Sequence, residues 1–339
     1  MQRDCAAASP HPAGSPGTHA GAELPLLEVR LASPRGFCAG VDRAIRIVEE
    51  ALRRHGAPVY VRHEIVHNSA VVAALRAKGA VFVPDLADVP AEAPVVFSAH
   101  GVSKSVAEEA GRRGLAALDA TCPLVAKVHR EAERHHAAGC HVLLIGHAGH
   151  PEVEGTLGQL PARAITLVQS EADARSVRPP AGRLAFVTQT TLSVDDTAAI
   201  VGVLRARFPA LEGPRREDIC YATTNRQAAV KAIAPGADLV LVVGSPNSSN
   251  SQRLREAAER AGAARALLVS GAEALEGIDM AGVRTLGLTA GASAPEALVQ
   301  ALLARLATRY RLRIDERRVT DEDVSFKLPA PLAEAASLG

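Results

Sequence analysis

Short runs of valine, isoleucine and leucine alternate along the chain with polar or glycine-containing loops and with alanine-rich stretches of helical periodicity. The first run, residues 26–32, leads through a polar loop to a predicted helix over residues 41–55. Strands that alternate with helices in this way are typical of proteins with largely parallel sheets. The pattern therefore predicts the α/β fold class.

The same arrangement recurs twice further along the chain. Residues 115–120 predict a strand that leads to Cys122 and a helix ending near residue 136. Residues 216–219 predict a strand that leads to Cys220 and a helix ending near residue 234. With Cys38 in the first run, each copy places a cysteine where a strand ends and a helix begins. Few residues are identical between copies, so the repeat is one of architecture and not of sequence.

Two further polar loops follow each cysteine. The second loops carry His67, His150 and Ser248, which lie 29, 28 and 28 residues after the preceding cysteine. The third loops span residues 98–103, 188–193 and 289–295. Functional loops of open α/β sheets gather at the carboxyl ends of the strands. We therefore expect three similar units around an axis, with three cysteines and six polar loops at one cavity.

The unit boundaries follow from these spacings. The three units are expected at residues 26–121, 122–219 and 220–310. Residues 1–25, rich in Ala, Pro, Gly, Ser and His, predict a disordered N-terminal extension. Residues 311–339 predict a C-terminal segment in which residues 324–328 form a short strand that returns to the core.

Composition and charge narrow the possible functions. The 339 residues carry a formal net charge of +1, no tryptophan, three tyrosines and six phenylalanines. Neither a basic surface nor stacking platforms for bases are indicated, which argues against nucleic-acid binding. The apolar runs are far shorter than the roughly 20 residues of a membrane helix, and the N-terminus resembles no secretory or transit signal. We expect a cytoplasmic protein that binds neither nucleic acid nor membrane.

The five cysteines are odd in number and widely dispersed, which argues against a disulfide framework. Cys5 and Cys140 lie outside the repeated pattern, and we expect neither to be a metal ligand. Three thiolates from separate units suit a soft metal centre. Zinc with three cysteines is one candidate, and an iron–sulfur cubane with one free iron is the other. The plain alternative is that these cysteines are small buried hydrophobes.

The companion loops place hydrogen-bonding side chains near predicted helix N-termini. Such termini bind phosphate, so a small phosphorylated ligand is predicted. Serine, threonine and asparagine are also ordinary helix N-caps, which is the plain interpretation of the same residues. The candidate residues are His67, His100, His150, Thr190, Ser248, Ser249, Asn250 and Ser293.

The glycine-rich loop over residues 146–152 holds a histidine and a carboxylate two residues apart. Glu152 is a candidate general acid whose protonation is set by partial burial, with His150 as its partner or as a phosphate ligand. A zinc site formed by His147, His150 and Glu152 is the alternative. Their spacing does not match the helical His-Glu-x-x-His pattern.

At these residues the sequence resembles the LytB (IspH) family, whose members reduce 4-hydroxy-3-methylbut-2-enyl diphosphate in the last step of the methylerythritol phosphate route to isoprenoids. The resemblance extends over about residues 27–328, with Pro246 where many relatives have lysine. The matching stretches are residues 34–44, 63–68, 98–102, 119–125, 146–156, 188–196, 218–227, 247–251 and 289–295.

The resemblance implies a trefoil-like arrangement of the three units around a central [4Fe-4S] cluster. Cys38, Cys122 and Cys220 would hold the cluster and leave one iron open. Glu152 and Thr190 would contact the substrate hydroxyl, and Glu152 would supply protons. The residues implied for the diphosphate are His67, His100, Ser248, Asn250 and Ser293, with Ser249 and His150 adjoining.

The implied reaction is a two-electron reductive dehydroxylation that yields isopentenyl diphosphate and dimethylallyl diphosphate. Ferredoxin or flavodoxin would donate the electrons. Two other functions remain open at this point. One is a zinc hydrolase that uses the three cysteines or the His147 loop, and the other is a non-catalytic iron–sulfur sensor that binds a partner or RNA.

Overall fold

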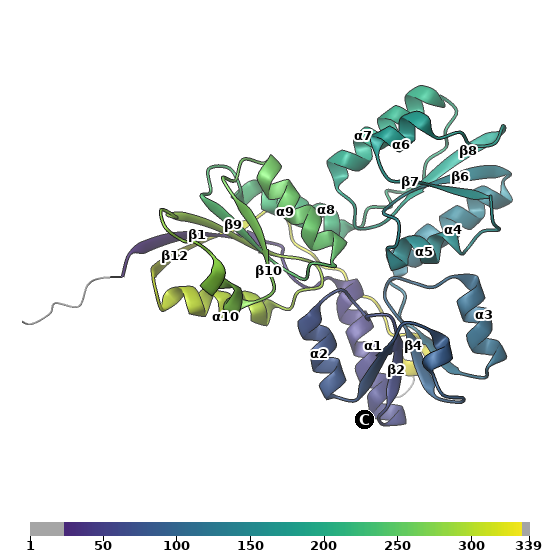
Figure 1. Cartoon of the computed structure of the whole chain (residues 1–339), viewed down its shortest axis with the longest axis horizontal. Coiled ribbons are helices and arrows are strands. Elements are labelled where there is room, and N and C mark those ends of the chain that lie inside the picture. The colour runs from purple at the N-terminus through teal and green to yellow at the C-terminus, as the bar shows by residue number, and fades with distance from the viewer. Residues whose placement is uncertain (1–23, 334–339) are drawn as a thin grey trace, which may run out of the picture.

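The structure, a computed structural model, describes residues 24–333. The predicted disordered extension lies almost entirely outside these residues. The strands form three sheets in which every pairing is parallel. Figure 1 shows the three sheets in three separate lobes that meet at the centre of the molecule. The expected α/β class with three parallel units is confirmed.

The first lobe holds a sheet in the order β3-β2-β4-β5. Helix α1 packs on β2 and β4, and α2 packs on β3. Apolar residues of α1 at helical spacing, among them Ala44, Ile47, Val48 and Ala51, are fully buried against the sheet. Its elements are α1 (Ala39–His55), β2 (Val59–Arg62), α2 (Ser69–Ala77), β3 (Ala80–Val83), the 3₁₀ turn η1 (Leu86–Asp88), β4 (Pro94–Phe97), α3 (Lys104–Arg112) and β5 (Ala116–Asp119).

The second lobe holds a sheet in the order β7-β6-β8, with α4 packed on β6 and β8. The buried strand residues Leu143 and Ile145 form a core with Leu204 of the last helix. The elements of this lobe are α4 (Pro123–Ala137), β6 (Cys140–Ile145), α5 (Pro151–Leu157), β7 (Ile165–Val168), α6 (Glu171–Ser176), β8 (Arg183–Thr188) and α7 (Val194–Arg207).

The third lobe holds a sheet in the order β10-β9-β11-β1-β12, with α8 packed on β1, β11 and β12. All five residues of β9 are buried, which is typical of a central parallel strand. The elements are β1 (Leu26–Ser33), α8 (Tyr221–Ile233), β9 (Leu239–Val243), α9 (Ser249–Arg260), β10 (Ala266–Val269), η2 (Ala272–Gly277), β11 (Thr285–Ala290), α10 (Glu296–Ala307) and β12 (Arg311–Arg318).

The chain ahead of each cysteine is paired in one lobe, and the helix that begins at the cysteine packs in the next lobe. β5 pairs with β4 of the first lobe, yet the helix after Cys122 packs in the second lobe. Ahead of Cys220, Glu212 makes an isolated parallel bridge to Ala185 of the second lobe. By the same rule β1, ahead of Cys38, pairs with β11 of the third lobe. We had expected this strand in the unit 26–121, but it completes the third sheet.

Two predicted strands are absent from the described residues. Residues 216–219 form no strand. In the described segment between α7 and Cys220, the only pairing with a sheet is the isolated bridge at Glu212. The C-terminal strand is β12, paired with β1 from Leu26 to Ser33, and not residues 324–328. β12 contains six charged residues among eight and lies at the sheet edge, where charges stay in water. A search for apolar runs therefore misses it.

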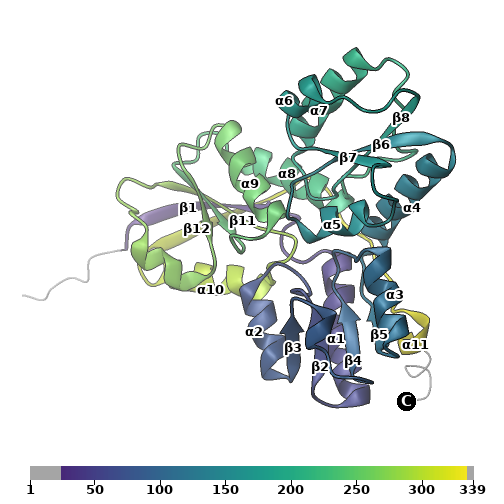
Figure 2. The same ribbon diagram turned by 45° about the vertical axis from the view of Figure 1, so that its right-hand side comes forward.

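Residues 319–329 cross from the third lobe to the first as an extended strap that ends at α11 (Ala330–Ala333). Figure 2 shows this C-terminal segment beside the first lobe, far from β12. Arg43 of α1 donates a hydrogen bond from Nε to the Lys327 carbonyl oxygen at 2.8 Å. Leu332 is buried in the core of the first lobe. The strap therefore fastens the third lobe to the first.

Candidate active site

One cavity at the junction of the three lobes is lined by all twelve residues that the sequence singles out for catalysis, binding or metal coordination. The space between them, including its open mouth, is about 670 Å³. No lysine or arginine lines this cavity among the described residues.

Each of the three cysteines is the N-cap residue of a helix, α1, α4 or α8. Their backbone N–H groups make three equivalent hydrogen bonds to the loops of neighbouring lobes. Cys38 donates to the carbonyl oxygen of Ala292 at 3.2 Å, Cys122 to that of Ala99 at 2.9 Å, and Cys220 to that of Thr190 at 3.1 Å. These bonds join each cysteine to the third polar loop of the preceding unit, and they place all three sulfurs at the cavity.

The cysteines fit a soft metal centre. Burial, together with the neighbouring Cys38 and Cys220, raises the pKa of Cys122 to about 12. Burial and Cys38 raise the pKa of Cys220 to about 11. Three buried thiolates repel one another, and a bound metal is the usual means of keeping such thiols deprotonated.

The space between the sulfurs indicates the size of that centre. A Cβ atom built on Gly40 would lie 2.7 Å from the Cys122 sulfur and 3.8 Å from the Cys38 sulfur, so only glycine leaves this space open. The three sulfurs are not all within 4.8 Å of one another. Ligands of one tetrahedral zinc ion are closer than this, about 3.3–3.7 Å apart given its bond lengths. The spacing favours a cluster over a single ion.

Three histidines form a compact group on the side of the cavity supplied by the first two lobes. The rings of His67 and His100 are stacked with centroids 4.1 Å apart, and His150 meets both edge-on at 5.3 and 5.6 Å. Burial lowers the pKa of His150 to about 3 and that of His100 well below its usual range. The rings of His100 and His150 are therefore neutral N–H donors at pH 7. The Nε2 atom of His67 is buried and has no hydrogen-bond partner. A ligand bound in the cavity could satisfy this atom.

Glu152 is 2% exposed and lies in the first turn of α5. Its carboxylate accepts hydrogen bonds from the Thr190 backbone N–H at 2.6 Å and from the Thr190 hydroxyl at 3.1 Å. Burial raises the pKa of Glu152 to about 7, and these two bonds oppose the rise. A carboxyl group with this pKa both holds and releases a proton near neutral pH, which general acid catalysis requires.

The third lobe contributes the N-terminus of α9 and the loop after β11. Ser248 is the N-cap of α9, and its hydroxyl accepts from the Ser251 backbone N–H at 3.3 Å. Asn250 accepts from the Ala292 backbone N–H at 2.8 Å, which fixes its side chain. Ser293 donates to the His67 carbonyl oxygen at 2.9 Å. Neutral donors and a helix N-terminus thus face the histidine group, an arrangement suited to phosphate.

Sequence reasoning missed several residues of the cavity. Thr223 donates its backbone N–H to the Cys220 sulfur at 3.4 Å, and its hydroxyl lies 3.2 Å from that sulfur. Thr191 and Leu124 also line the cavity. Thr223 lies three residues after a cysteine N-cap, the position from which a backbone N–H reaches the capping side chain. That spacing was available in the sequence and could have identified it.

The alternative zinc site at the glycine-rich loop is not formed. His147 lines a second cavity together with Thr197 and Arg253, and not the cavity that holds His150 and Glu152. The ligand atoms of His147, His150 and Glu152 are not all within 4.8 Å of one another.

The fold and the site together define a class of protein with three parallel α/β lobes around a thiol-lined cavity that also holds neutral hydrogen-bond donors and a helix N-terminus. The chain belongs to the LytB protein family, whose pattern matches residues 29–307. The family expected from the sequence is therefore confirmed.

Named relatives agree with this membership. The chain is 67% identical over 312 residues to the 4-hydroxy-3-methylbut-2-enyl diphosphate reductase of Gluconobacter oxydans, covering 91% of this chain and 93% of that protein. It is 60% identical to the reductase of the same name from Paracoccus denitrificans, covering 92% and 99%.

A solved structure is also similar. The structure of the E-1-hydroxy-2-methyl-but-2-enyl-4-diphosphate reductase from Plasmodium falciparum superposes with a TM-score of 0.86 at 37% identity, covering 93% of this chain and 99% of that one.

Proposed function

We propose that this chain catalyses the reductive removal of the hydroxyl group from 4-hydroxy-3-methylbut-2-enyl diphosphate. Its activity is that of the reductases to which it is 60–67% identical over more than nine tenths of its length. A reductase of solved structure that is 30% identical to this chain is titled the terminal enzyme of the non-mevalonate pathway. The observation that carries the proposal is the position of Glu152 and Thr190 in the same cavity as three partly buried cysteines.

Written in full, the reaction consumes one substrate molecule, two electrons and two protons. The C–O bond to the hydroxyl breaks, water leaves, and a proton adds to the allylic fragment to give isopentenyl or dimethylallyl diphosphate. A one-electron carrier of the ferredoxin or flavodoxin class supplies the electrons.

Cys38, Cys122 and Cys220 would hold a [4Fe-4S] cluster. When bound, the cluster supplies electrons one at a time and a Lewis-acidic iron that no protein ligand occupies. The three cysteines fix its place through the backbone bonds that tie each of them to a neighbouring lobe. Gly40 keeps free the space that a side chain would take between two of the sulfurs.

The diphosphate is assigned to His67, His100, Ser248, Asn250 and Ser293, with Ser249 and His150 adjoining. His67 offers an unpartnered buried Nε2 atom, and the α9 N-terminus offers its dipole and backbone N–H groups. In the part of the chain that the structure describes, no lysine or arginine lines the cavity, so neutral hydrogen-bond donors carry the recognition. A bound anion would also raise the pKa of His100 and His150 from their lowered values and increase the fraction that carries charge.

Glu152 is placed to deliver protons. Its neutral form is favoured by burial, and the Thr190 hydroxyl fixes the orientation of the carboxyl group. Thr190 can contact the substrate hydroxyl with the same group that it presents to Glu152. The pair therefore joins the leaving oxygen to a proton source.

The direct test supplies the anaerobically purified protein with the substrate and a chemically reduced viologen as electron donor. Formation of isopentenyl and dimethylallyl diphosphate, with two viologen cations oxidised per product, supports the proposal. Release of phosphate without consumption of electrons would instead support a hydrolase. An intact cluster without any turnover would favour the sensor.

No helix in residues 24–333 combines the length and apolar character that crossing a membrane demands. We place the reaction in the cytoplasm, where ferredoxin and flavodoxin are available as donors.

A further inference from the structure

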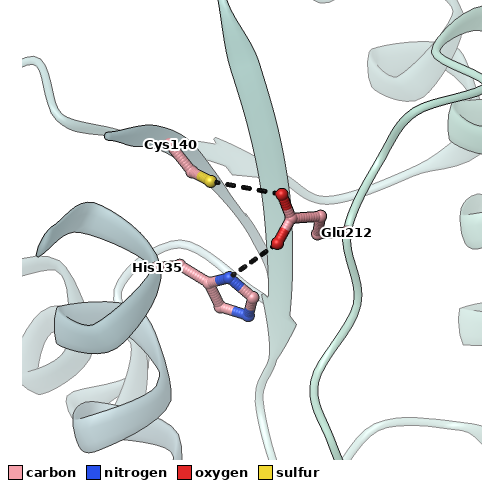
Figure 3. Close-up of side chains that lie close together, drawn as sticks. All are labelled: His135, Cys140 and Glu212. Atoms are coloured by element: carbon pink, nitrogen blue, oxygen red, sulfur yellow. Dashed lines mark hydrogen bonds and ion pairs between the residues drawn. The ribbon is translucent and has the colours of Figure 1, made fainter. Parts of the chain in front are cut away.

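A histidine, a cysteine and a glutamate outside the active-site cavity meet at the opposite edge of the second sheet (Figure 3). His135 lies in the last turn of α4, and Cys140 is the first residue of β6. Glu212 lies in the connection that leads from α7 to Cys220. One ligand atom from each of the three lies within 4.8 Å of the other two.

The contacts between these groups are long: the Cys140 thiol donates a weak hydrogen bond to Glu212, and the His135–Glu212 pair is at the distance limit of an ion pair. The Cys140 sulfur is 3.8 Å from Oε1 of Glu212, and Nδ1 of His135 is 4.0 Å from Oε2. His135 is 1% exposed, and its Nδ1 atom is buried without a hydrogen-bond partner. A buried polar atom in that state costs free energy unless a ligand satisfies it. Figure 3 shows this nitrogen directed at the carboxylate.

We propose that His135, Cys140 and Glu212 bind a zinc ion. Thiolate, imidazole and carboxylate are the three donor types that zinc takes from proteins, and a thiolate disfavours magnesium and calcium. Tetrahedral zinc ligands lie about 3.3–3.7 Å apart, so the present spacing needs only a small contraction. Zinc stays divalent, the thiol proton leaves to solvent, and the thiolate and carboxylate balance the ion's charge.

Two arginines adjoin the site, and their hydrogen bonds determine which carboxylate oxygen and which ring nitrogen are free to bind the ion. Arg183 donates from Nη2 to Oε1 of Glu212 at 2.6 Å, which leaves Oε2, the oxygen facing His135, for the ion. Arg134 lies 3.1 Å from Nε2 on the other side of the ring. Zinc on Nδ1 places the ring proton on Nε2, toward Glu131 at 3.8 Å, and turns Arg134 away. The Glu212 side chain is 40% exposed, so water can reach the fourth position.

The ion would have a structural role, because it would join three segments of the second lobe. The backbone of Glu212 is held to β8 by hydrogen bonds with Leu184 and Phe186, both at 2.9 Å. Zinc would join this point to the end of α4 and the start of β6. The fastened segment continues to Cys220, so the site would steady the approach to one cluster ligand from the far edge of the sheet.

The experiment titrates zinc chloride into the anaerobically purified chain with its iron–sulfur cluster in place, after a chelator wash. Zinc retained after desalting is measured by mass spectrometry of the metals in the wild type, Cys140→Ser, Glu212→Gln and His136→Ala. His136 is the neighbouring histidine of α4 and serves as the matched control. X-ray absorption at the zinc edge of the wild type reports the ligands without any substitution.

We expect about one zinc per chain in the wild type and His136→Ala, and at least a tenfold loss in Cys140→Ser and Glu212→Gln, with unchanged cluster absorption in all four. The zinc spectrum should contain one sulfur at about 2.3 Å and nitrogen or oxygen at about 2.0–2.1 Å. A wild type that retains no zinc would overturn the proposal. So would equal retention in Cys140→Ser, or a spectrum with three sulfurs, which would place zinc on the cluster cysteines.

Discussion

At the scale of single residues, burial decides the chemistry of the cavity. Glu152 is an acid with a pKa of about 7 because its carboxyl group is almost wholly removed from water. The same burial keeps His100 and His150 neutral. The pKa of this carboxyl group lies above those of the neighbouring imidazoles, which is the reverse of the order of these pKa values in water. The cavity thus gains a proton donor and neutral hydrogen-bond donors, while none of the described lysines and arginines lines it.

Replacing Glu152 with Gln should lower kcat by at least about 100-fold, the usual contribution of general acid catalysis. Glutamine retains the size of the side chain and can accept one bond from Thr190, so the cluster absorption should be unchanged. The measurement is turnover with reduced viologen, beside the cluster spectrum. Glu154→Gln, an exposed carboxylate of the same helix, is the control. Turnover near that of the wild type would remove Glu152 from the proton path.

The pH dependence follows from the raised pKa of Glu152. The protonated form is the donor, so kcat/KM should fall as pH rises through about 7.

The stability of the fold should also depend on the pKa of Glu152. The pKa of Glu152 in the folded state lies above the ordinary value of 4.5, so the folded state binds more protons than the unfolded state between these pH values. The free energy of unfolding therefore decreases as pH rises from about 4.5 to 7. In Glu152→Gln the decrease of kcat/KM and the decrease of the free energy of unfolding with rising pH should both vanish. If the residual activity of this variant still falls as pH rises through about 7, the titrating group is not Glu152.

At the scale of elements, each cysteine lies where the chain leaves one lobe and a helix begins in the next, although a full strand precedes only Cys38 and Cys122. The sequence predicts the helices well because their apolar spacing and polar caps are local signals. It also predicts which loops meet, because parallel strands bring their carboxyl ends to one edge. The lobe to which β1 belongs could not be predicted this way, since strand pairing is a non-local choice. β12 was missed because an exposed edge strand can be mostly charged.

Cys122→Ser should reduce the iron bound per chain by more than half, whereas Cys140→Ser should leave it unchanged. Cys122 lines the cavity beside the other two cysteines, and Cys140 lies at the start of β6, away from it. Iron and acid-labile sulfide analysis after anaerobic purification measures both variants. Loss of the cluster in Cys140→Ser would contradict the ligand assignment.

At the scale of the whole molecule, the C-terminal strap and the cysteine loops join the lobes. Arg226 is 1% exposed and donates to the carbonyl oxygens of Gly36 at 2.9 Å and Phe37 at 3.1 Å, just before Cys38. It also pairs with Glu322 of the strap at 2.8 Å. One buried guanidinium therefore holds the strap against the loop of a cluster ligand.

Glu322→Gln should lower the apparent Tm by several degrees, because it leaves the Arg226 charge buried without a counter-charge, a loss worth about 3 kcal/mol. Thermal unfolding followed by circular dichroism measures the change. Asp323→Asn, an exposed neighbour on the strap, should have little effect. Equal Tm values for the two variants would show that the ion pair does not hold the strap.

The central claim is that three lobes place three cysteines around an iron–sulfur cluster that the substrate can reach. The most direct measurement is the iron, acid-labile sulfide and zinc content of the anaerobically purified chain, with its visible spectrum before and after addition of 4-hydroxy-3-methylbut-2-enyl diphosphate. We predict about four irons and four sulfides per chain and a spectrum that changes with substrate. Zinc without iron or sulfide, found reproducibly, would contradict the assignment of the cysteines.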